Sequence, residues 1–532
     1  MKLSAQIVFM LLTCMSFSQG STINWQNSIG GSGNDNLLSI SPTTDGGYIL
    51  GGHSRSGISG DKSEALMGTI DYWIVKTDAQ GAVEWENALG GDDYEQFGRV
   101  FQLSDGGYFV AGESMSNISG DKTENRDGPP DTGDLWVLRL DSAGNVIWDS
   151  TLGGTNEEFF ADAIQLPNGN IVLAGTSGSN SSADKSENSK GAYDFWIMEL
   201  DSANGNIIWD ETIGGSSNDF ARSIDLDADG NIIIGGQSDS NISSDKTESS
   251  YGARDFWIVK IDDSGTTIWD KTIGGSGFEI FGSIEAILDD GFIIAGNSDS
   301  PISGLKDETC TGCDTNAVNR DIWVLKLDAN GTIEWQNTLG TIEDEEFQVT
   351  AINTNDGGYL IGGSSESGVS GDKTDAGYNG TDFWLIKLDQ NGQYIWDDAI
   401  GGTNYDDLWD MFELSNGNFI LGGTSMSSLN GDKTENTNGL NDYWIMEYSS
   451  GGLAIEQAVN NLKIEVFPNP VENFVTIKGE EIINVQILDL AGNVLVNTAS
   501  DQINLTSLDS GVYFVKVKNS SGGSMTKKFI KL

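Results

Sequence analysis

Residues 71–85 read DYWIVKTDAQGAVEW, and this stretch decides the fold. Two short runs of β-branched and aromatic residues, Tyr72–Val75 and Val83–Trp85, flank the turn sequence Asp78-Ala79-Gln80-Gly81. Two such runs around a Gly/Asp turn predict an antiparallel hairpin. Just upstream, the runs Leu37–Ile40 and Tyr48–Gly52 flank another Gly-rich turn. Residues 31–90 therefore predict four short strands and no helix.

Tryptophan shows that this unit recurs. Two series of seven tryptophans run through the chain, and within each series the spacing is 60 to 66 residues. The first series is Trp25, Trp85, Trp148, Trp209, Trp269, Trp335 and Trp396, and the second is Trp73, Trp136, Trp196, Trp257, Trp323, Trp384 and Trp444. Repeats of this length with four strands each are typical of β-propeller blades.

The two ends of the repeat region complement each other. No fourth strand follows Trp444, whereas the chain begins with an isolated strand-like run, Ile23–Asn27. Pairing of that run with the Trp444 strand would complete seven blades and remove a free sheet edge. We therefore predict an all-β chain with a seven-bladed propeller at residues 21–450. Its long second-to-third-strand loops emerge on one face, which is the natural binding face.

The amino terminus has the pattern of a leader. Lys2 is followed by an apolar run, Ile7–Met15, and then by small residues. This pattern predicts a signal peptide at residues 1–18, because the run is too short to cross a membrane. Cys14 leaves a lipoprotein leader as an alternative. We predict no transmembrane segment elsewhere in the chain.

Charge limits the possible partners. The formal net charge is −52, and the acidic excess lies between Trp25 and Lys463. Such a field repels phosphate backbones, so nucleic acid is not an expected partner. Cations and basic surfaces suit the field, although acidity can also serve solubility alone. No cofactor is predicted apart from a possible Ca²⁺.

Beyond a linker at residues 451–463, the sequence changes character. Alternating apolar residues and Gly turns predict a small β-sandwich at residues 464–532. The segment resembles the type A C-terminal sorting domain of the Bacteroidetes type IX secretion system. The residues that carry this resemblance are Pro468, Asn469, Pro470, Gly492, Gly511, Tyr513, Lys527 and Lys528.

The resemblance implies contact with the type IX machinery and an extracellular or outer-surface location. It leaves open whether the mature protein is released or anchored. The propeller region also looks like uncharacterised repeat regions that precede such sorting domains, and that similarity implies no activity.

Several motifs raise the question of chemistry. Six of the long loops contain Asp-Lys-Ser/Thr-Glu/Asp, as in Asp121-Lys122-Thr123-Glu124, and the fifth has Leu305-Lys306-Asp307-Glu308. These motifs either collect cations or fold their own loops, and their repetition favours folding. An Asp also stands two residues before each tryptophan of the second series, where we expect it to accept hydrogen bonds that close the loop.

Two sites are specific to one repeat. Asp225, Asp227 and Asp229 resemble the start of a calcium loop, although the later ligand positions hold Ile233 and Gly236. Cys310 and Cys313 form a C-x-x-C pair. The chain's single histidine, His53, leaves too few ligands for a Cys/His zinc site, so we predict a local disulfide in this exported protein.

Three functions remain open from the sequence. The leading prediction is a secreted or surface-bound adhesion-type propeller that binds a glycan, a protein or a cation. The second is a polysaccharide hydrolase with paired carboxylates, and the third is a structural surface component. A hydrolase would need a pair specific to one repeat, and the two irregular loops, at Pro129-Pro130 and Cys310–Cys313, are the places to look.

Overall fold

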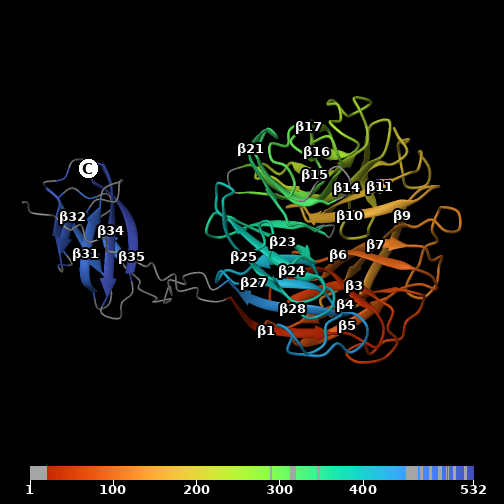
Figure 1. The fold of residues 1–532 in the computed structure, drawn as a ribbon, viewed down its shortest axis with the longest axis horizontal. Coiled ribbons are helices and arrows are strands. Elements are labelled where there is room, and N and C mark those ends of the chain that lie inside the picture. Colours follow the sequence, from red (N-terminus) through yellow and green to blue (C-terminus); the bar gives the residue numbers. More distant parts are fainter. Residues whose placement is uncertain are drawn as a thin grey trace, which may run out of the picture. The chain divides into compact units, whose positions relative to one another are not determined.

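A computed structural model divides the chain into two compact units, residues 21–450 and a second unit that contains the carboxyl-terminal segment (Figure 1). The structure describes residues 21–287, 290–311, 319–343, 345 and 348–450 of the first unit. In the carboxyl-terminal segment it describes residues 465–467, 471, 473–478, 482–488, 494–498, 500, 502–506, 508, 511–519 and 524–531.

Several predictions from the sequence concern residues outside those ranges. They are the signal peptide with Cys14, the linker at 451–463, Cys313, and the sorting residues Pro468, Asn469, Pro470 and Gly492. They stay predictions.

The described part of residues 21–450 contains seven four-stranded antiparallel sheets. Six of them take their strands in chain order. They are β2 (Asp35–Pro42), β3 (Tyr48–Ser54), β4 (Asp71–Thr77) and β5 (Val83–Leu89); β6 (Glu95–Gln102), β7 (Tyr108–Ser114), β8 (Asp134–Leu140) and β9 (Val146–Leu152); β10 (Glu158–Gln165), β11 (Ile171–Ser177), β12 (Asp194–Leu200) and β13 (Ile207–Ile213); β14 (Asp219–Leu226), β15 (Ile232–Ser238), β16 (Asp255–Ile261) and β17 (Thr267–Ile273); β18 (Glu279–Ala286), β19 (Phe292–Ser298), β20 (Asp321–Leu327) and β21 (Ile333–Leu339); and β22 (Thr350–Asn353), β23 (Tyr359–Ser365), β24 (Asp382–Leu388) and β25 (Tyr394–Ile400).

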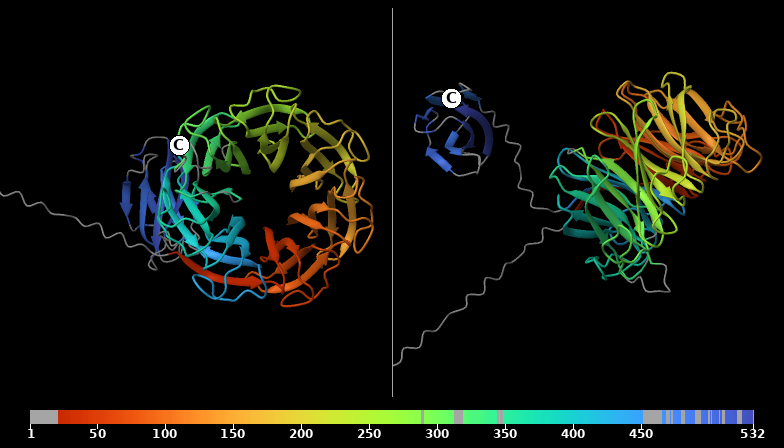
Figure 2. Two further views of the ribbon diagram at one scale, coloured as in Figure 1. Left: turned by 45° about the vertical axis from the view of Figure 1, so that its right-hand side comes forward. Right: turned by 90° about the horizontal axis from the view of Figure 1, so that it is seen from above.

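The seventh sheet joins the two ends of the unit. It contains β26 (Asp406–Glu413), β27 (Phe419–Ser425) and β28 (Asp442–Ser449), and β1 (Thr22–Ile29) supplies its fourth strand. β1 pairs with β28 from Thr22 opposite Ser449 to Ile29 opposite Tyr443. Figure 2 shows the sheets following one another around a central axis, and β2 of the first sheet contacts β26, β27 and β28 of the seventh. This is an arrangement of the β-propeller type.

Burial explains the strand sequences. The third strand of each sheet is packed between neighbouring sheets on both faces, so nearly every residue in it is buried, as in β12 and β16. The second-series tryptophans lie there and are fully buried. The fourth strand is at the outer rim, where its first residues are exposed. Strands covered on both faces are apolar throughout, whereas rim strands carry polar residues.

A bulge interrupts the innermost strand in six of the seven sheets. In β6 the register shifts between Phe97 and Arg99, and in β10 it shifts between Phe160 and Asp162. A bulge re-aims the side chains beside it. It thereby places Arg99 and Asp162 where they can meet side chains of other sheets.

The turns on the face opposite the long loops are tight. In the hairpin between β4 and β5, Asp78 Oδ1 accepts hydrogen bonds from the backbone N–H groups of Gln80 and Ala82, both at 2.9 Å. Gly81 has φ +76, a conformation that side chains with a Cβ rarely adopt. The same arrangement recurs after β8, β16, β20 and β24.

The carboxyl-terminal unit forms two sheets. One contains β29 (Glu465–Phe467), β30 (Phe474–Lys478) and β33 (Gln502–Asn504). The other contains β31 (Ile482–Leu488), β32 (Val494–Thr498), β34 (Gly511–Asn519) and β35 (Ser524–Lys531). Its core includes Val475, Ile477, Val485, Ile487, Val515 and Val517. Across the described residues of both units there are no helices, hence none of the length and apolarity that a membrane crossing requires.

Candidate functional site

The long-loop motifs fold their own loops. In the second sheet, Lys122 is buried, lies 5.5 Å from the centre of the Trp136 ring and donates to Thr151 Oγ1. Asp149 accepts from Thr123 N at 2.9 Å and from Trp136 Nε1 at 3.0 Å. Glu124 accepts from the backbone N–H of Thr151 at 2.8 Å. These contacts use most of the motif's hydrogen-bonding groups within one sheet.

Exceptions to the motif are compensated locally. In the fifth sheet, Gln336 replaces the strand carboxylate, accepts from Trp323 Nε1 at 3.0 Å and donates to Leu305 O at 2.9 Å. In the seventh sheet Gln26 has the same role toward Trp444. The lysines of six sheets lie 5.0 to 5.9 Å from the tryptophan rings. A buried lysine therefore stabilises each loop from beneath.

The aspartates that open the third strands accept hydrogen bonds from their loops. Each accepts a backbone N–H of the long loop at 2.5 to 2.8 Å, as Asp71 does from Met67 and Asp134 from Asp127. Burial raises the pKa of Asp134, Asp321 and Asp382 to about 7. This arrangement recurs in all seven sheets, so a raised pKa here reflects the scaffold.

An ionic cluster on the innermost strands breaks the repeat. Arg99 of the second sheet lies 3.6 Å from Asp162 of the third, measured from Nε to Oδ1. Its Nη1 lies 3.3 Å from Asp410 Oδ2 of the seventh sheet. Burial raises the pKa of Asp162 and Asp410, and Arg99 opposes that rise. The sequence analysis did not predict this cluster. The position equivalent to Arg99 is serine in three other repeats, at Ser39, Ser223 and Ser283, so the arginine was a usable signal.

The calcium candidates face different neighbours. Asp225 accepts from the backbone of Ala286 in the next sheet at 2.8 Å. Asp227 pairs with Lys260 at 2.6 Å and closes its own turn, and Asp229 is exposed. Among the described residues, no group of three or more His, Cys, Asp or Glu side chains is placed to hold a metal ion. A calcium site at these three residues stays a prediction without support from their placement.

The two irregular loops have ordinary structural contacts. Cys310 is buried and disulfide-bonded, while its predicted partner Cys313 lies outside the described ranges. In the other loop, the carbonyl of Pro129 accepts from Thr132 Oγ1 at 2.9 Å and from Arg126.

The sorting residues that the structure describes lie in one hairpin. Gly511 pairs with Lys531, Tyr513 with Phe529, and Lys527 with Val515. Lys528 pairs with Phe514 in the same ladder. The described part of the signature therefore belongs to β34 and β35.

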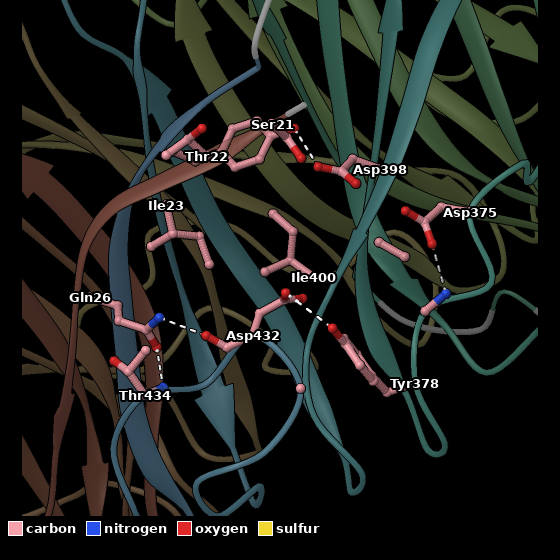
Figure 3. Close-up of a pocket in the computed structure, with 14 residues that line it drawn as sticks. Ser21, Thr22, Ile23, Gln26, Asp375, Tyr378, Asp398, Ile400, Asp432 and Thr434 are labelled. Carbon is pink, nitrogen blue, oxygen red and sulfur yellow. Dashed lines mark hydrogen bonds between the residues drawn. The ribbon is translucent and has the colours of Figure 1, made fainter. Parts of the chain in front are cut away.

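One cavity breaks the symmetry of the repeat. It lies between the sixth and seventh sheets and has a volume of about 640 Å³ (Figure 3). Three aspartates and two tyrosines line it, namely Asp375, Asp398, Asp432, Tyr378 and Tyr448. β1 contributes Gln26 and its first residues. No lysine or arginine is among its described lining residues.

Two short side chains of the sixth repeat lie in the wall of the cavity. Asp375 stands where the other six loops have Glu, and Ala399 stands where four of the fourth strands have Thr. Both residues line the cavity. The missing threonine also leaves Lys373 Nζ without a hydrogen-bond acceptor among the described residues. The shorter acid at position 375 is specific to the sixth repeat, whereas the alanine at position 399 is shared with the first sheet at Ala88.

Two of the three carboxylates of the cavity accept a hydrogen bond from a tyrosine, and none has a basic partner among the described lining residues. Tyr448 donates to Asp398 at 2.7 Å, and Tyr378 donates to Asp432 at 3.3 Å. Burial raises the pKa of Asp398, and the nearby carboxylate of Asp375 adds to that rise. Burial also raises the pKa of Asp432. A cation in the cavity would stabilise the ionised carboxylates.

Comparison with known proteins identifies the carboxyl-terminal unit. Residues 465–532 match the family described as the secretion system C-terminal sorting domain. The chain is therefore a secreted protein with a type IX sorting domain, located outside the cell or at its surface. No curated protein matches the sequence.

The matches among solved structures are distant. A protein of unknown function from Bacteroides caccae is 13% identical, with a TM-score of 0.33, over 69% of this chain and 94% of that one. BamB from Moraxella catarrhalis is 12% identical, with a TM-score of 0.33, over 96% and 97%. The Pan2 WD40 domain of Neurospora crassa is 10% identical, with a TM-score of 0.41, over 81% and 96%.

Proposed function

We propose that this chain is a secreted or surface-bound binding protein that takes a small organic cation into the cavity between its sixth and seventh sheets. The scaffold would be a closed seven-bladed propeller, and a C-terminal β-sandwich would direct export. The pairing of β1 with β28 and the contacts of β2 with the seventh sheet support closure.

The observation that carries the proposal is the composition of the cavity wall. Three carboxylates and two phenols face a space of about 640 Å³ with no basic side chain among its described lining residues. That volume falls within the range of small-ligand sites. An ammonium or guanidinium group would satisfy the carboxylates, and the ring of Tyr378 could add a cation–π contact.

Calorimetric titration of the full chain with spermidine at 0.15 M salt tests this function. We expect one binding event per chain, weakened at least tenfold by Asp398→Asn. Asp92→Asn, an exposed acid elsewhere, should leave the affinity unchanged. Many weak events that disappear with salt would instead indicate attraction to the overall charge of −52 and would contradict a defined site.

Hydrolysis of a polysaccharide is the second candidate. Asp375 and Asp398 form a carboxylate pair with no basic residue among the described cavity lining, whereas the equivalent pair of the third sheet, Glu187 and Glu211, has Lys190 Nζ 3.9 Å from Glu187. Release of reducing sugar from a neutral polysaccharide, lost in Asp398→Asn, would assign the cavity to catalysis. Spermidine binding without sugar release would favour the cation-binding function.

A further inference from the structure

The long loops expose aliphatic side chains at one equivalent position. These side chains, the aliphatic set, are Ile58, Ile118, Ile242, Ile302, Val369 and Leu429. Each is 60% to 69% exposed, and only the third repeat has a polar residue there, Ser181. All six precede the buried lysine of their loop by four residues.

The position lies within a repeated loop motif, with serine two residues before it in all six repeats and serine immediately after it in five. The residue immediately before it is Gly57, Asn117, Asn241, Pro301, Gly368 and Ser428 in the same six repeats. A side chain that is 60% to 69% exposed buries little apolar surface on folding. Six exposed aliphatic side chains at equivalent positions therefore give the long loops recurring apolar points that a partner can contact.

All six members lie on the same face of the first unit. Every sheet is antiparallel, so all second-to-third-strand loops emerge on one side. The connections between successive sheets emerge there too, as bridges from Ile70 to Tyr94 and from Arg254 to Phe278 show. Phe278 and Tyr405, about half exposed, add aromatic surface to this loop face.

Burial of the lysines sets the charge of the loop face. By sequence each motif contains one lysine beside two acids, but that lysine is at most 2% exposed in every sheet. The acids at the end of the motif stay exposed in most loops, among them Glu64, Glu124 and Glu187. A partner would therefore meet aliphatic tips and carboxylates, with the compensating ammonium groups beneath the surface.

We propose that the loop face binds a basic protein surface that carries apolar side chains. Charge complementarity selects this partner, because a second copy of the same face would bring acids against acids. A neutral glycan would gain no hydrogen bonds from the aliphatic set. This surface is separate from the cavity, so the inference does not rest on cation binding there.

Binding of the full chain to immobilised peptides tests the proposal. The probes are an amphipathic leucine–lysine peptide and a polylysine peptide of equal charge. We expect tighter binding to the leucine–lysine peptide. The triple variant Ile58→Ser, Ile118→Ser, Ile302→Ser should lower that affinity at least tenfold and leave polylysine binding unchanged.

The rim strands offer a matched control. Ile147, Ile208 and Ile268 on β9, β13 and β17 are 50% to 55% exposed and lie away from the long loops. Their triple serine variant should bind the leucine–lysine peptide as the parent chain does. Equal losses in both triple variants would indicate general surface stickiness and overturn the proposal.

Sedimentation of the chain without peptide tests whether a second copy of the chain occupies the loop face instead. Self-association that the loop-face variant abolishes and the rim variant retains would identify a second copy of the chain as the partner. That result would also overturn the proposal. Asp398→Asn serves as an independent check, since it should not change peptide binding by the loop face.

Discussion

At the scale of single residues, the molecule shows how one motif can be both repeated and adjusted. The strand carboxylate that receives a loop N–H and a tryptophan Nε1 is Asp149 in the second sheet, and an amide takes its place at Gln336 and Gln26. The shared requirement is an acceptor at that point. Charge is secondary, because the buried lysine is held by its tryptophan in either case.

Asp149→Ala tests this requirement. The change leaves Trp136 Nε1 and the N–H of Thr123 without their acceptor. The Thr123 bond is exposed and the Trp136 bond is partly buried, so the main cost is that of the unsatisfied indole N–H, about 1–3 kcal/mol, and we expect a lower melting temperature and a lower urea midpoint. Asp149→Asn should cost less, since an amide oxygen can still accept. Asp263→Ala on an exposed turn is the control, and an equal loss there would refute the role of Asp149.

At the scale of the elements, each sheet buries several carboxylates near its long loop. The pKa is raised by burial to about 7 for Asp134, Asp321 and Asp382, and to about 6 for Asp442. These groups titrate near pH 4 in an unfolded chain. Between pH 4 and 7 the folded state therefore binds more protons than the unfolded state.

This difference fixes the direction of the pH dependence. Stability contributed by a carboxylate with a raised pKa is present at low pH and is lost as the pH rises through the folded pKa. The urea midpoint of unfolding should thus be higher at pH 5.5 than at pH 7.5. The buried lysines oppose this only in part, since a pKa lowered to about 8, as for Lys122 and Lys246, leaves them mostly charged up to pH 7.5. A urea midpoint that rises from pH 5.5 to pH 7.5 would contradict the conclusion that burial raises the pKa of these carboxyl groups.

The elements were also what the sequence predicted best. Runs such as Tyr72–Val75 repeat with a tryptophan at a fixed place, and local patterns of this kind specify strands and turns. The cavity and the Arg99 cluster depend on side chains from different sheets. Asp398 meets Tyr448 across 50 residues, and Arg99 meets Asp410 across 311. Such contacts leave no local pattern, although departures from the repeat at Asp375 and Ala399 were readable.

At the scale of the whole molecule, the ends of the first unit depend on each other. β1 contributes residues to the seventh sheet and to the cavity, so the same strand completes the scaffold and the proposed site. Without it, β28 would become a free strand edge with unpaired N–H and C=O groups. Trp444 Nε1 would also lose Gln26 as its acceptor.

Deletion of residues 21–29 from the mature chain tests this dependence. We expect a large fall in melting temperature, increased aggregation and no spermidine binding, because the cavity loses one wall while the edge of β28 becomes free. A permuted chain in which residues 21–29 follow Ser449 through a short glycine linker should recover stability, since β1 and β28 are antiparallel neighbours. Circular dichroism during heating measures the melting temperature of both variants, and light scattering measures their aggregation. A deletion variant that melts like the parent chain would show that the seventh sheet is stable with three strands and that closure contributes little.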